Sequence, residues 1–113
     1  MSAVYVPEAG DLVWLTFDPQ AGREQAGRRP ALVLSPRAYN AKSGLALVCP
    51  ITSQVKGYPF EVAVTSGRGV TGVVLADHLK SVDWKARHAE RLGPCATEVI
   101  DDVRARLAPL LGY

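Results

Sequence analysis

Short apolar runs bounded by proline, glycine or charged residues recur along most of the chain. The stretch 11–18 (DLVWLTFD) is rich in β-branched and aromatic residues, a composition typical of a strand. In the stretch 59–65 (PFEVAVT), Phe60, Val62 and Val64 alternate with other side chains, which is the two-residue period of a half-buried strand. The pattern therefore predicts a protein built mainly from short strands.

Further apolar runs continue this pattern through the middle of the chain. They predict strands at 31–35, 45–52, 72–79, around 81–84 and at 87–92. Because Pro50 has no backbone N–H to donate, its strand is expected at a sheet edge or to contain a bulge. The polar stretches 19–30 and 53–58 predict loops, and 37–44 leaves room for one helical turn.

The C-terminal stretch has a different period. Its apolar stripe consists of Val99, Ile100, Val103, Leu107, Leu110 and Leu111. The four-residue spacing predicts a helix that buries one face, with Thr97 as its N-terminal cap and Pro109 near its end. Connections between the strands are mostly too short for crossover helices, so an antiparallel sheet is expected. The sequence thus predicts one mainly β domain over residues 1–113, a small barrel of five to seven strands with a C-terminal α-helix.

Composition narrows the class of protein without changing this architecture. The 113 residues are 48% hydrophobic and 21% charged, which is typical of a globular domain. The longest apolar run, at about 44–51, is too short to cross a membrane, and the first residues lack the features of a secretory signal. Cys49 and Cys95 are expected to be small buried residues. We therefore expect a soluble cytoplasmic protein.

The net charge of +2 hides an uneven distribution. Residues 19–91 carry eleven basic and five acidic side chains, a surplus of six positive charges. The two flanks carry two basic and six acidic side chains, a surplus of four negative charges. Cations gathered on loops around one concave surface attract a polyanion, although scattered surface charge would give the same count. The distribution suggests a nucleic-acid partner without establishing one.

The segment 24–29 (EQAGRR) places a carboxylate and two guanidinium groups within six residues. Metal-free RNA cleavage needs a base for the ribose 2′-hydroxyl and a cation for the charge that develops on the phosphate. Glu24 and Arg29 fit these two roles, and the hydroxyl of Thr52 at a strand end can bind the same phosphate. The same residues equally suit a simple ion pair that holds the loop. His78 and His88 are expected to be ordinary surface or half-buried histidines.

Five stretches of the sequence carry a more specific signal. They are 10–19 (GDLVWLTFDP), 24–36 (EQAGRRPALVLSP), 39–44 (YNAKSG), 50–62 (PITSQVKGYPFEV) and 72–87 (GVVLADHLKSVDWKAR). Together they closely resemble the MazF/PemK family of toxin endoribonucleases. The resemblance implies a small SH3-like barrel that works as a homodimer and cuts single-stranded RNA, often messenger RNA. It further implies no metal or other cofactor, products with 2′,3′-cyclic phosphate and 5′-hydroxyl ends, and inhibition by a MazE-like antitoxin.

The resemblance also assigns roles to individual residues. The catalytic residues of the family fall on Arg29 and Thr52, and the proposed general base falls on Glu24. Positions expected to contact RNA are Phe17, Asn40, Gln54, Lys56, His78 and Lys80. Two positions depart from the family pattern: His78 replaces a glutamine, and Arg28 stands where a histidine can occur, which would add charge beside the reaction centre.

A second class of function fits the same fold. CcdB-like toxins poison DNA gyrase without catalysis and act through their C-terminal region, so they need no loop residues suited to chemistry. Here the C-terminus reads as an ordinary amphipathic helix, and the set of Glu24, Arg29 and Thr52 favours catalysis. The RNA endonuclease is therefore the main hypothesis and the gyrase poison is the alternative.

Overall fold

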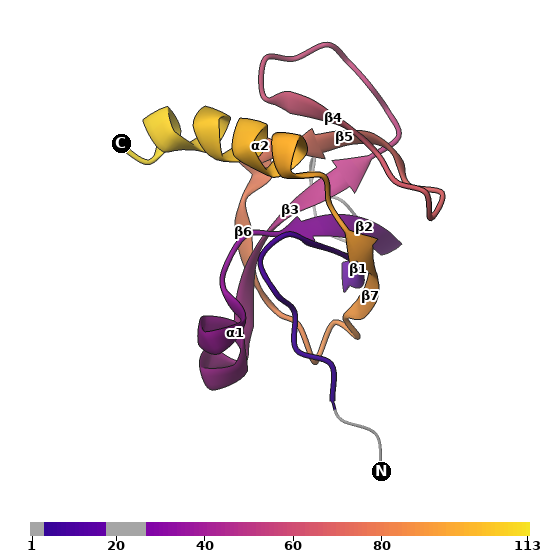
Figure 1. Ribbon diagram of the computed structural model, residues 1–113, viewed down its shortest axis with the longest axis vertical. Coiled ribbons are helices and arrows are strands. Elements are labelled where there is room, and N and C mark those ends of the chain that lie inside the picture. The colour runs from indigo at the N-terminus through magenta and orange to yellow at the C-terminus, as the bar shows by residue number, and fades with distance from the viewer. Residues whose placement is uncertain (1–3, 18–26) are drawn as a thin grey trace.

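The computed structural model describes residues 4–17 and 27–113. Within them the chain forms seven strands, two α-helices and one short 3₁₀ helix (Figure 1). In chain order these are β1 (Asp11–Phe17), β2 (Gly27–Val33), α1 (Arg37–Ser43), β3 (Leu45–Thr52), β4 (Glu61–Thr65), β5 (Thr71–Leu75), η1 (Ala76–His78), β6 (Lys80–Asp83), β7 (Glu90–Pro94) and α2 (Thr97–Leu110). No helix of these residues is long and apolar enough to cross a membrane.

All seven strands join one curled antiparallel sheet, which forms a half-barrel with α2 across it. The strand order is β4-β5-β3-β2-β1-β7, and β6 pairs with β3 off this path. Strand β3 changes partners along its length: Leu45–Val48 pair with β6, and Ile51 and Thr52 pair with β5. The predicted mainly β fold with a C-terminal helix is confirmed.

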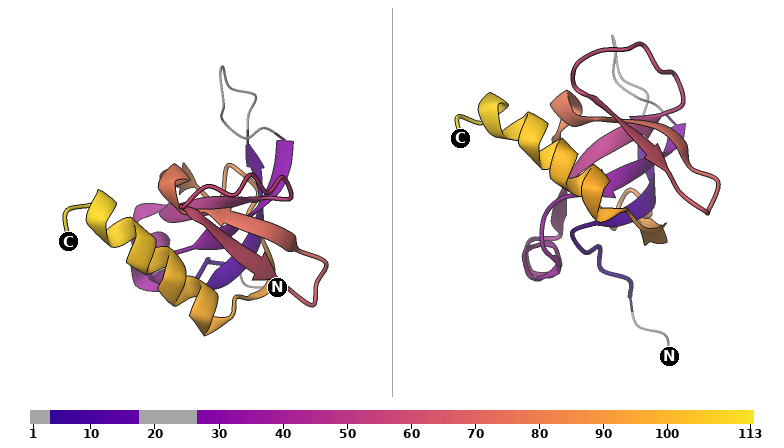
Figure 2. Two further views of the ribbon diagram at one scale, coloured as in Figure 1. Left: turned by 90° about the horizontal axis from the view of Figure 1, so that it is seen from above. Right: turned by 45° about the horizontal axis from the view of Figure 1, so that its top comes forward.

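The two faces of the sheet carry separate hydrophobic cores. On one face, Leu12, Leu32 and Ile51 pack with Val103 and Leu107 of α2. The views in Figure 2 show α2 lying across this part of the sheet, with its C-terminal end projecting beyond it. On the other face, Val13, Leu15, Phe17, Val33, Val48 and Trp84 form the second core. This division separates the side chains of neighbouring residues in β1, β2 and β3, because they alternate between faces.

The helix α2 agrees with the prediction in its position but not at its ends. Val103 and Leu107 are buried as expected, whereas Leu110 and Leu111 are exposed because the helix runs past the sheet. The predicted cap at Thr97 is wrong: Thr97 is the first helical residue, Ala96 precedes it, and no side chain caps the start. Pro109 lies in the last turn, close to where the helix ends at Leu110.

Two other predictions from proline and charge content are wrong. The polar stretch 19–30 is not a loop throughout, because β2 begins at Gly27 and pairs with β1, so that Thr16 lies opposite Arg28. Pro50 does not mark an edge or a bulge, since β3 lies within the sheet and Pro50 pairs with Ala31. Pro50 lies between the part of β3 that pairs with β6 and the part that pairs with β5. On this side of β3 none of the described strands accepts a hydrogen bond at that position, so the missing backbone N–H of proline is tolerated.

The predicted strand at 72–79 is shorter than expected. Strand β5 ends at Leu75, and His78 belongs to the 3₁₀ helix η1 that follows. Both cysteines are buried and free, as expected. Burial raises the pKa of the Cys49 thiol to about 12 and also raises that of Cys95, so neither is a nucleophile at neutral pH.

Candidate functional site

The sheet brings Arg29 and Thr52 to the same face and the same end of two neighbouring strands. Strand β2 pairs with β3 so that Ala31 lies opposite Pro50. Continuing this register by two residues places Arg29 opposite Thr52, and paired residues of antiparallel strands point to the same side. Two residues that are 23 positions apart in sequence are therefore neighbours at the strand ends.

The Thr52 hydroxyl is held in a defined orientation. Its side chain is nearly buried, with the residue 8% exposed, and the backbone N–H of Gln54 donates to Oγ1 at 3.1 Å. Because Oγ1 accepts this bond, the hydroxyl proton remains for donation to a second group. The adjacent strand β5 passes so close that a Cβ on Gly72 would collide with the Thr52 carbonyl. Thr52 is thus a rigidly placed donor beside Arg29.

The loop after Thr52 is pinned at its far end by Glu61. The Glu61 carboxylate accepts the backbone N–H of Lys56 at 3.1 Å and that of Gly57 at 2.9 Å. Arg106 of α2 donates to the carbonyl of Pro59 and pairs with Asp102 at 3.0 Å. These contacts fix the backbone of the loop and leave the side chains of Gln54 and Lys56 exposed to solvent.

A pair of cations lies on the same sheet face, over the ring of Phe17. Lys80 Nζ lies 5.2 Å from the ring centroid, and the guanidinium carbon of Arg87 lies 5.9 Å from it. Phe17 itself is only 3% exposed, so in this structure its ring supports the two cations and does not offer a free face for a base. Arg87 is an additional candidate residue of this site, to which sequence analysis assigned no role. Its position beside Phe17 depends on long-range packing.

Asn40, His78 and Glu24 complete the expected set. Asn40 is fully buried, with its amide bonded to Ser35 and to the Pro7 carbonyl, so its side chain has a structural role here. Its expected RNA contact stays a prediction. His78 lies on η1 with its Nε2 3.9 Å from an Asp77 oxygen, and its side chain is 38% exposed. Glu24 lies outside the described residues.

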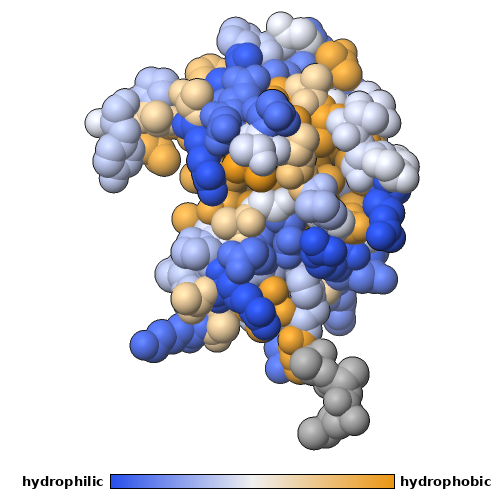
Figure 3. Space-filling view, viewed as in Figure 1, coloured by the Kyte–Doolittle hydropathy of each residue, from blue (hydrophilic) through white to orange (hydrophobic). Residues whose placement is uncertain are grey.

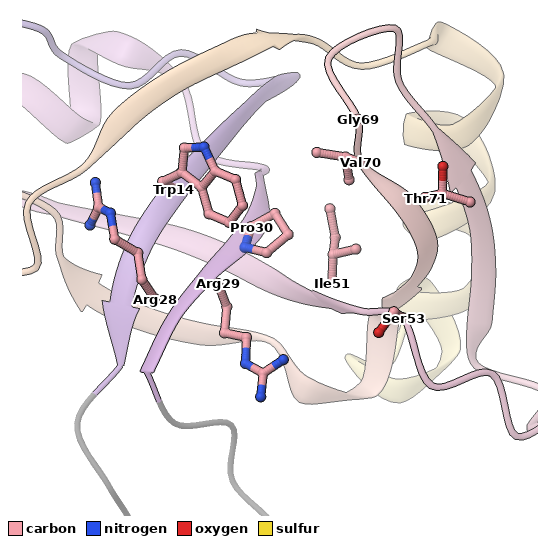
Figure 4. A pocket seen from close by; sticks show the side chains of 9 residues that line it. All are labelled: Trp14, Arg28, Arg29, Pro30, Ile51, Ser53, Gly69, Val70 and Thr71. Carbon is pink, nitrogen blue, oxygen red and sulfur yellow. The ribbon is translucent and has the colours of Figure 1, made fainter.

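Arg28 does not add free charge beside Arg29, contrary to expectation. Its guanidinium donates to the hydroxyl of Thr16 and to the carboxylate of Glu90, both at 3.0 Å. The carboxylate offsets the charge of Arg28. Figure 4 shows the guanidinium groups of Arg28 and Arg29 pointing in different directions.

A cavity of about 300 Å³ opens beside these strand ends (Figure 4). Its middle is apolar and includes Trp14, Pro30, Ile51 and Val70. The residues at its more polar positions are Arg28, Arg29, Ser53 and Thr71. Trp14, Pro30 and Ile51 point to the opposite face of the sheet from Thr52, because side chains alternate along a strand. The cavity therefore lies on that opposite face, and it reaches the Arg29–Thr52 pair at the strand ends. Trp14, the large aromatic residue of β1 that lines this cavity, was assigned no role from the sequence.

Beyond this site, the surface mixes polar and apolar residues. Figure 3 shows hydrophilic side chains over much of one face, with hydrophobic ones interspersed. Among the described residues, no three or more His, Cys, Asp or Glu side chains gather in a way that could hold a metal ion.

The curled antiparallel sheet, with an arginine, a buried threonine and two further cations on one face near its strand ends, defines a small mainly β protein with a cationic surface site. Residues 8–111 match the family model of the PemK-like, MazF-like toxin of type II toxin–antitoxin systems, and the chain belongs to this family.

Named relatives agree over almost the whole chain. The chain is 52% identical over 112 residues to the endoribonuclease toxin MazF of Escherichia coli K12, covering 99% of this chain and 100% of that protein. The crystal structure of MazF from Deinococcus radiodurans superposes with a TM-score of 0.91 at 59% identity, covering 97% of this chain and 100% of the other. A MazE–MazF structure from the same organism matches with a TM-score of 0.86 at 54% identity, covering 97% and 99%.

Proposed function

We propose that this protein is the toxin of a type II toxin–antitoxin system and a sequence-specific endoribonuclease that cuts single-stranded messenger RNA. The observation that carries the proposal is the pairing of β2 with β3, whose register, continued by two residues, brings Arg29 near the start of β2 opposite the oriented Thr52 hydroxyl at the end of β3. Relatives that cover the whole chain are endoribonuclease toxins by name. Cleavage of messages in the cytoplasm would stop translation and growth.

The proposed reaction uses the substrate's own ribose as the nucleophile. The 2′-oxygen attacks phosphorus, the bond from phosphorus to the 5′-oxygen breaks, and a 2′,3′-cyclic phosphate and a 5′-hydroxyl result. Glu24 takes the 2′-proton, and an acid returns a proton to the departing 5′-oxygen. Arg29 and Thr52 donate hydrogen bonds to the phosphate oxygens, whose negative charge grows in the transition state. Because Arg29 and Thr52 offset the phosphate charge that a metal ion would otherwise neutralise, we propose that the reaction needs no metal ion or cofactor.

Binding of the RNA strand is assigned to the cations and polar groups around this pair. Lys80 and Arg87 are held over Phe17 on the same sheet face, and Lys56 and Gln54 project from the pinned loop. Cations in these positions suit contacts with the phosphates that flank the cleaved bond. His78 is half-exposed on η1, and we propose it as a candidate for base contacts.

The comparisons also support a protein partner. The Deinococcus structures include complexes described as MazE–MazF, so we propose a MazE-like antitoxin for this chain. An acidic extended segment of such a partner would cover the cations of the RNA site and block it. We further propose that the protein acts as a homodimer.

The gyrase-poison alternative is not favoured. The named relatives are endoribonuclease toxins, and nothing in α2 beyond its sheet-packed face calls for a separate function.

A cleavage assay with a matched variant tests the proposal. Purified protein is incubated with a long RNA of known sequence, and the 5′ ends of the fragments are mapped. We expect discrete cuts at a short recurring sequence, and a fall in kcat of about 10²- to 10³-fold for Arg29→Ala, as for removal of one transition-state donor. Arg37→Ala removes an exposed arginine elsewhere and should cut like the parent. Intact RNA with the parent protein, or undiminished cleavage by Arg29→Ala, would contradict the proposal.

A further inference from the structure

We propose that Arg28 is a positioning residue that sets the geometry of Arg29, and that it does not itself bind RNA phosphate. The proposal rests on the endoribonuclease function above and goes beyond it, because it concerns the side chain on the opposite face of the strand. Three contacts of one guanidinium carry it.

The Arg28 guanidinium joins three segments of the chain. Nη1 donates to the hydroxyl of Thr16 on β1 at 3.0 Å. Nη2 donates to the carbonyl of His88 at 2.9 Å and to the carboxylate of Glu90 on β7 at 3.0 Å. We call these four residues, Thr16, Arg28, His88 and Glu90, the Arg28 clamp.

The partners of Arg28 are themselves fixed. The Thr16 backbone N–H donates to the Arg87 carbonyl at 2.9 Å, and the Arg87 side chain donates back to the Thr16 carbonyl at 3.2 Å. His88 has a positive φ of 56°, which is uncommon for a residue with a side chain, so its carbonyl is directed by a specific turn. The clamp therefore ties β2 to a rigid part of the molecule.

The place of the clamp in the sheet links it to catalysis. Thr16 and Arg28 are a directly opposed pair close to the end of the β1–β2 ladder, with Phe17 and Gly27 beyond them. Arg29 follows at once and points to the other face, because strand side chains alternate. Rotation or fraying of β2 at residue 28 would thus move Arg29 relative to Thr52. A displacement of about 1 Å is enough to lower a rate about 100-fold.

The charge balance of the clamp argues against a role in holding phosphate. Glu90 pairs with Arg28, and two of the three groups that Arg28 contacts are neutral.

The Arg28–Glu90 ion pair is exposed, with 38% of the Arg28 side chain and 71% of the Glu90 side chain accessible. Exposed ion pairs contribute little to stability, so the clamp is expected to affect local geometry more than global folding.

The variant Arg28→Gln distinguishes a positioning role from phosphate binding and from a purely structural role. We expect kcat to fall by about 10- to 100-fold with KM, the salt dependence of RNA binding and Tm nearly unchanged. Arg104→Gln, which removes an exposed arginine of α2, is the matched control and should behave like the parent. Weaker binding with a shallower salt dependence would show that Arg28 binds phosphate, and a lower Tm with unchanged kcat would show a purely structural role. Either result overturns the proposal.

A double substitution tests whether Arg28 acts through Arg29. In an Arg29→Ala background, adding Arg28→Gln should cause no further loss of kcat, because the group that it positions is gone. A second full loss would contradict the proposal.

Glu90→Gln provides an independent route if Arg28→Gln does not fold. It breaks one contact at an exposed site and should lower kcat in the same direction by a smaller factor. An unchanged kcat for Glu90→Gln, with the parent cutting normally, would also overturn the proposal. If the unsubstituted protein cut no RNA, that result would instead refute the proposed function.

Discussion

The Thr52 side chain illustrates how one backbone contact prepares a residue for chemistry. The Thr52 hydroxyl oxygen accepts a hydrogen bond from the backbone N–H of Gln54, and the hydroxyl proton can be donated to a phosphate oxygen. Arg29, near the start of β2, supplies the positive charge. We infer that the two residues bind one phosphate together. The arginine contributes positive charge, and the threonine contributes a hydrogen bond of fixed orientation.

Removing the Thr52 hydroxyl tests this division of roles. Thr52→Val keeps the shape of the side chain, and we expect kcat to fall by about 10- to 100-fold, the value of one hydrogen bond to a charged group. The measurement is single-turnover cleavage of a short RNA. Thr65→Val, at the exposed end of β4, is the control and should retain the parent rate. An unchanged rate for Thr52→Val would remove this residue from the mechanism.

The candidate site could be predicted from sequence only in part. Arg29, Thr52, Gln54, Lys56 and Lys80 lie where such roles are possible, because their local sequence places them at strand ends or on an exposed loop. The burial of Asn40 could not be foreseen, since it depends on Pro7 and Trp84, which are distant in sequence. The same holds for Phe17 and its two cations.

At the level of the elements, the close approach of β5 to β3 is the most restrictive packing feature of the site. A Cβ at position 72 would collide with the Thr52 carbonyl, so only glycine lets β5 pair with β3 there. The sequence signal for this contact is a single Gly within a strand, which indicates either a bulge or a close approach.

Gly72→Ala should therefore disturb both stability and catalysis. The strands must separate locally, so we expect a loss of about 1–3 kcal/mol in the free energy of unfolding and a lower kcat in the folded protein. Gly67→Ala is the matched control, because nothing lies within 4 Å of a Cβ there and its φ is not restricted. Chemical denaturation and cleavage kinetics of both variants provide the comparison. Equal stability of the two variants would contradict the packing argument.

Most elements were predictable because their periodicity reflects local burial. The strands and α2 follow from the two-residue and four-residue patterns, respectively. The early start of β2 could not be predicted, because its polar residues are stabilised by pairing with β1 and by the Arg28 clamp. Pro50 was misleading for a similar reason, since the partner strand of β3 changes at that point.

At the scale of the whole molecule, the positive charges that surround the site determine how RNA binding responds to salt. Lys80→Ala and Lys56→Ala should each weaken RNA binding and reduce the slope of log K against log salt by about 0.7, if each neutralises one phosphate of a single strand. Lys42→Ala, on α1, should leave the slope unchanged. Binding titrations at several salt concentrations measure this. An unchanged slope for Lys80→Ala would place it outside the RNA site.

The buried thiol of Cys49 makes stability depend on alkaline pH. Its pKa is raised from 9.0 to about 12, mainly by burial, so the folded state disfavours the thiolate. The stabilisation is complete below pH 9 and is lost as the pH rises toward 12, with a slope of up to about 1.4 kcal/mol per pH unit. Denaturation between pH 8 and 10 should show this decline, and Cys49→Ala should flatten it. An equal slope in the variant would contradict the assignment.

The chemistry of the cut ends tests the central claim most directly. A defined RNA is cleaved in excess EDTA, and the termini of the fragments are identified by mass spectrometry. We predict 2′,3′-cyclic phosphate and 5′-hydroxyl ends, because the ribose 2′-oxygen attacks a phosphate held by Arg29 and Thr52. Fragments with 5′-phosphate ends, or no cleavage until a divalent metal is restored, would contradict the account.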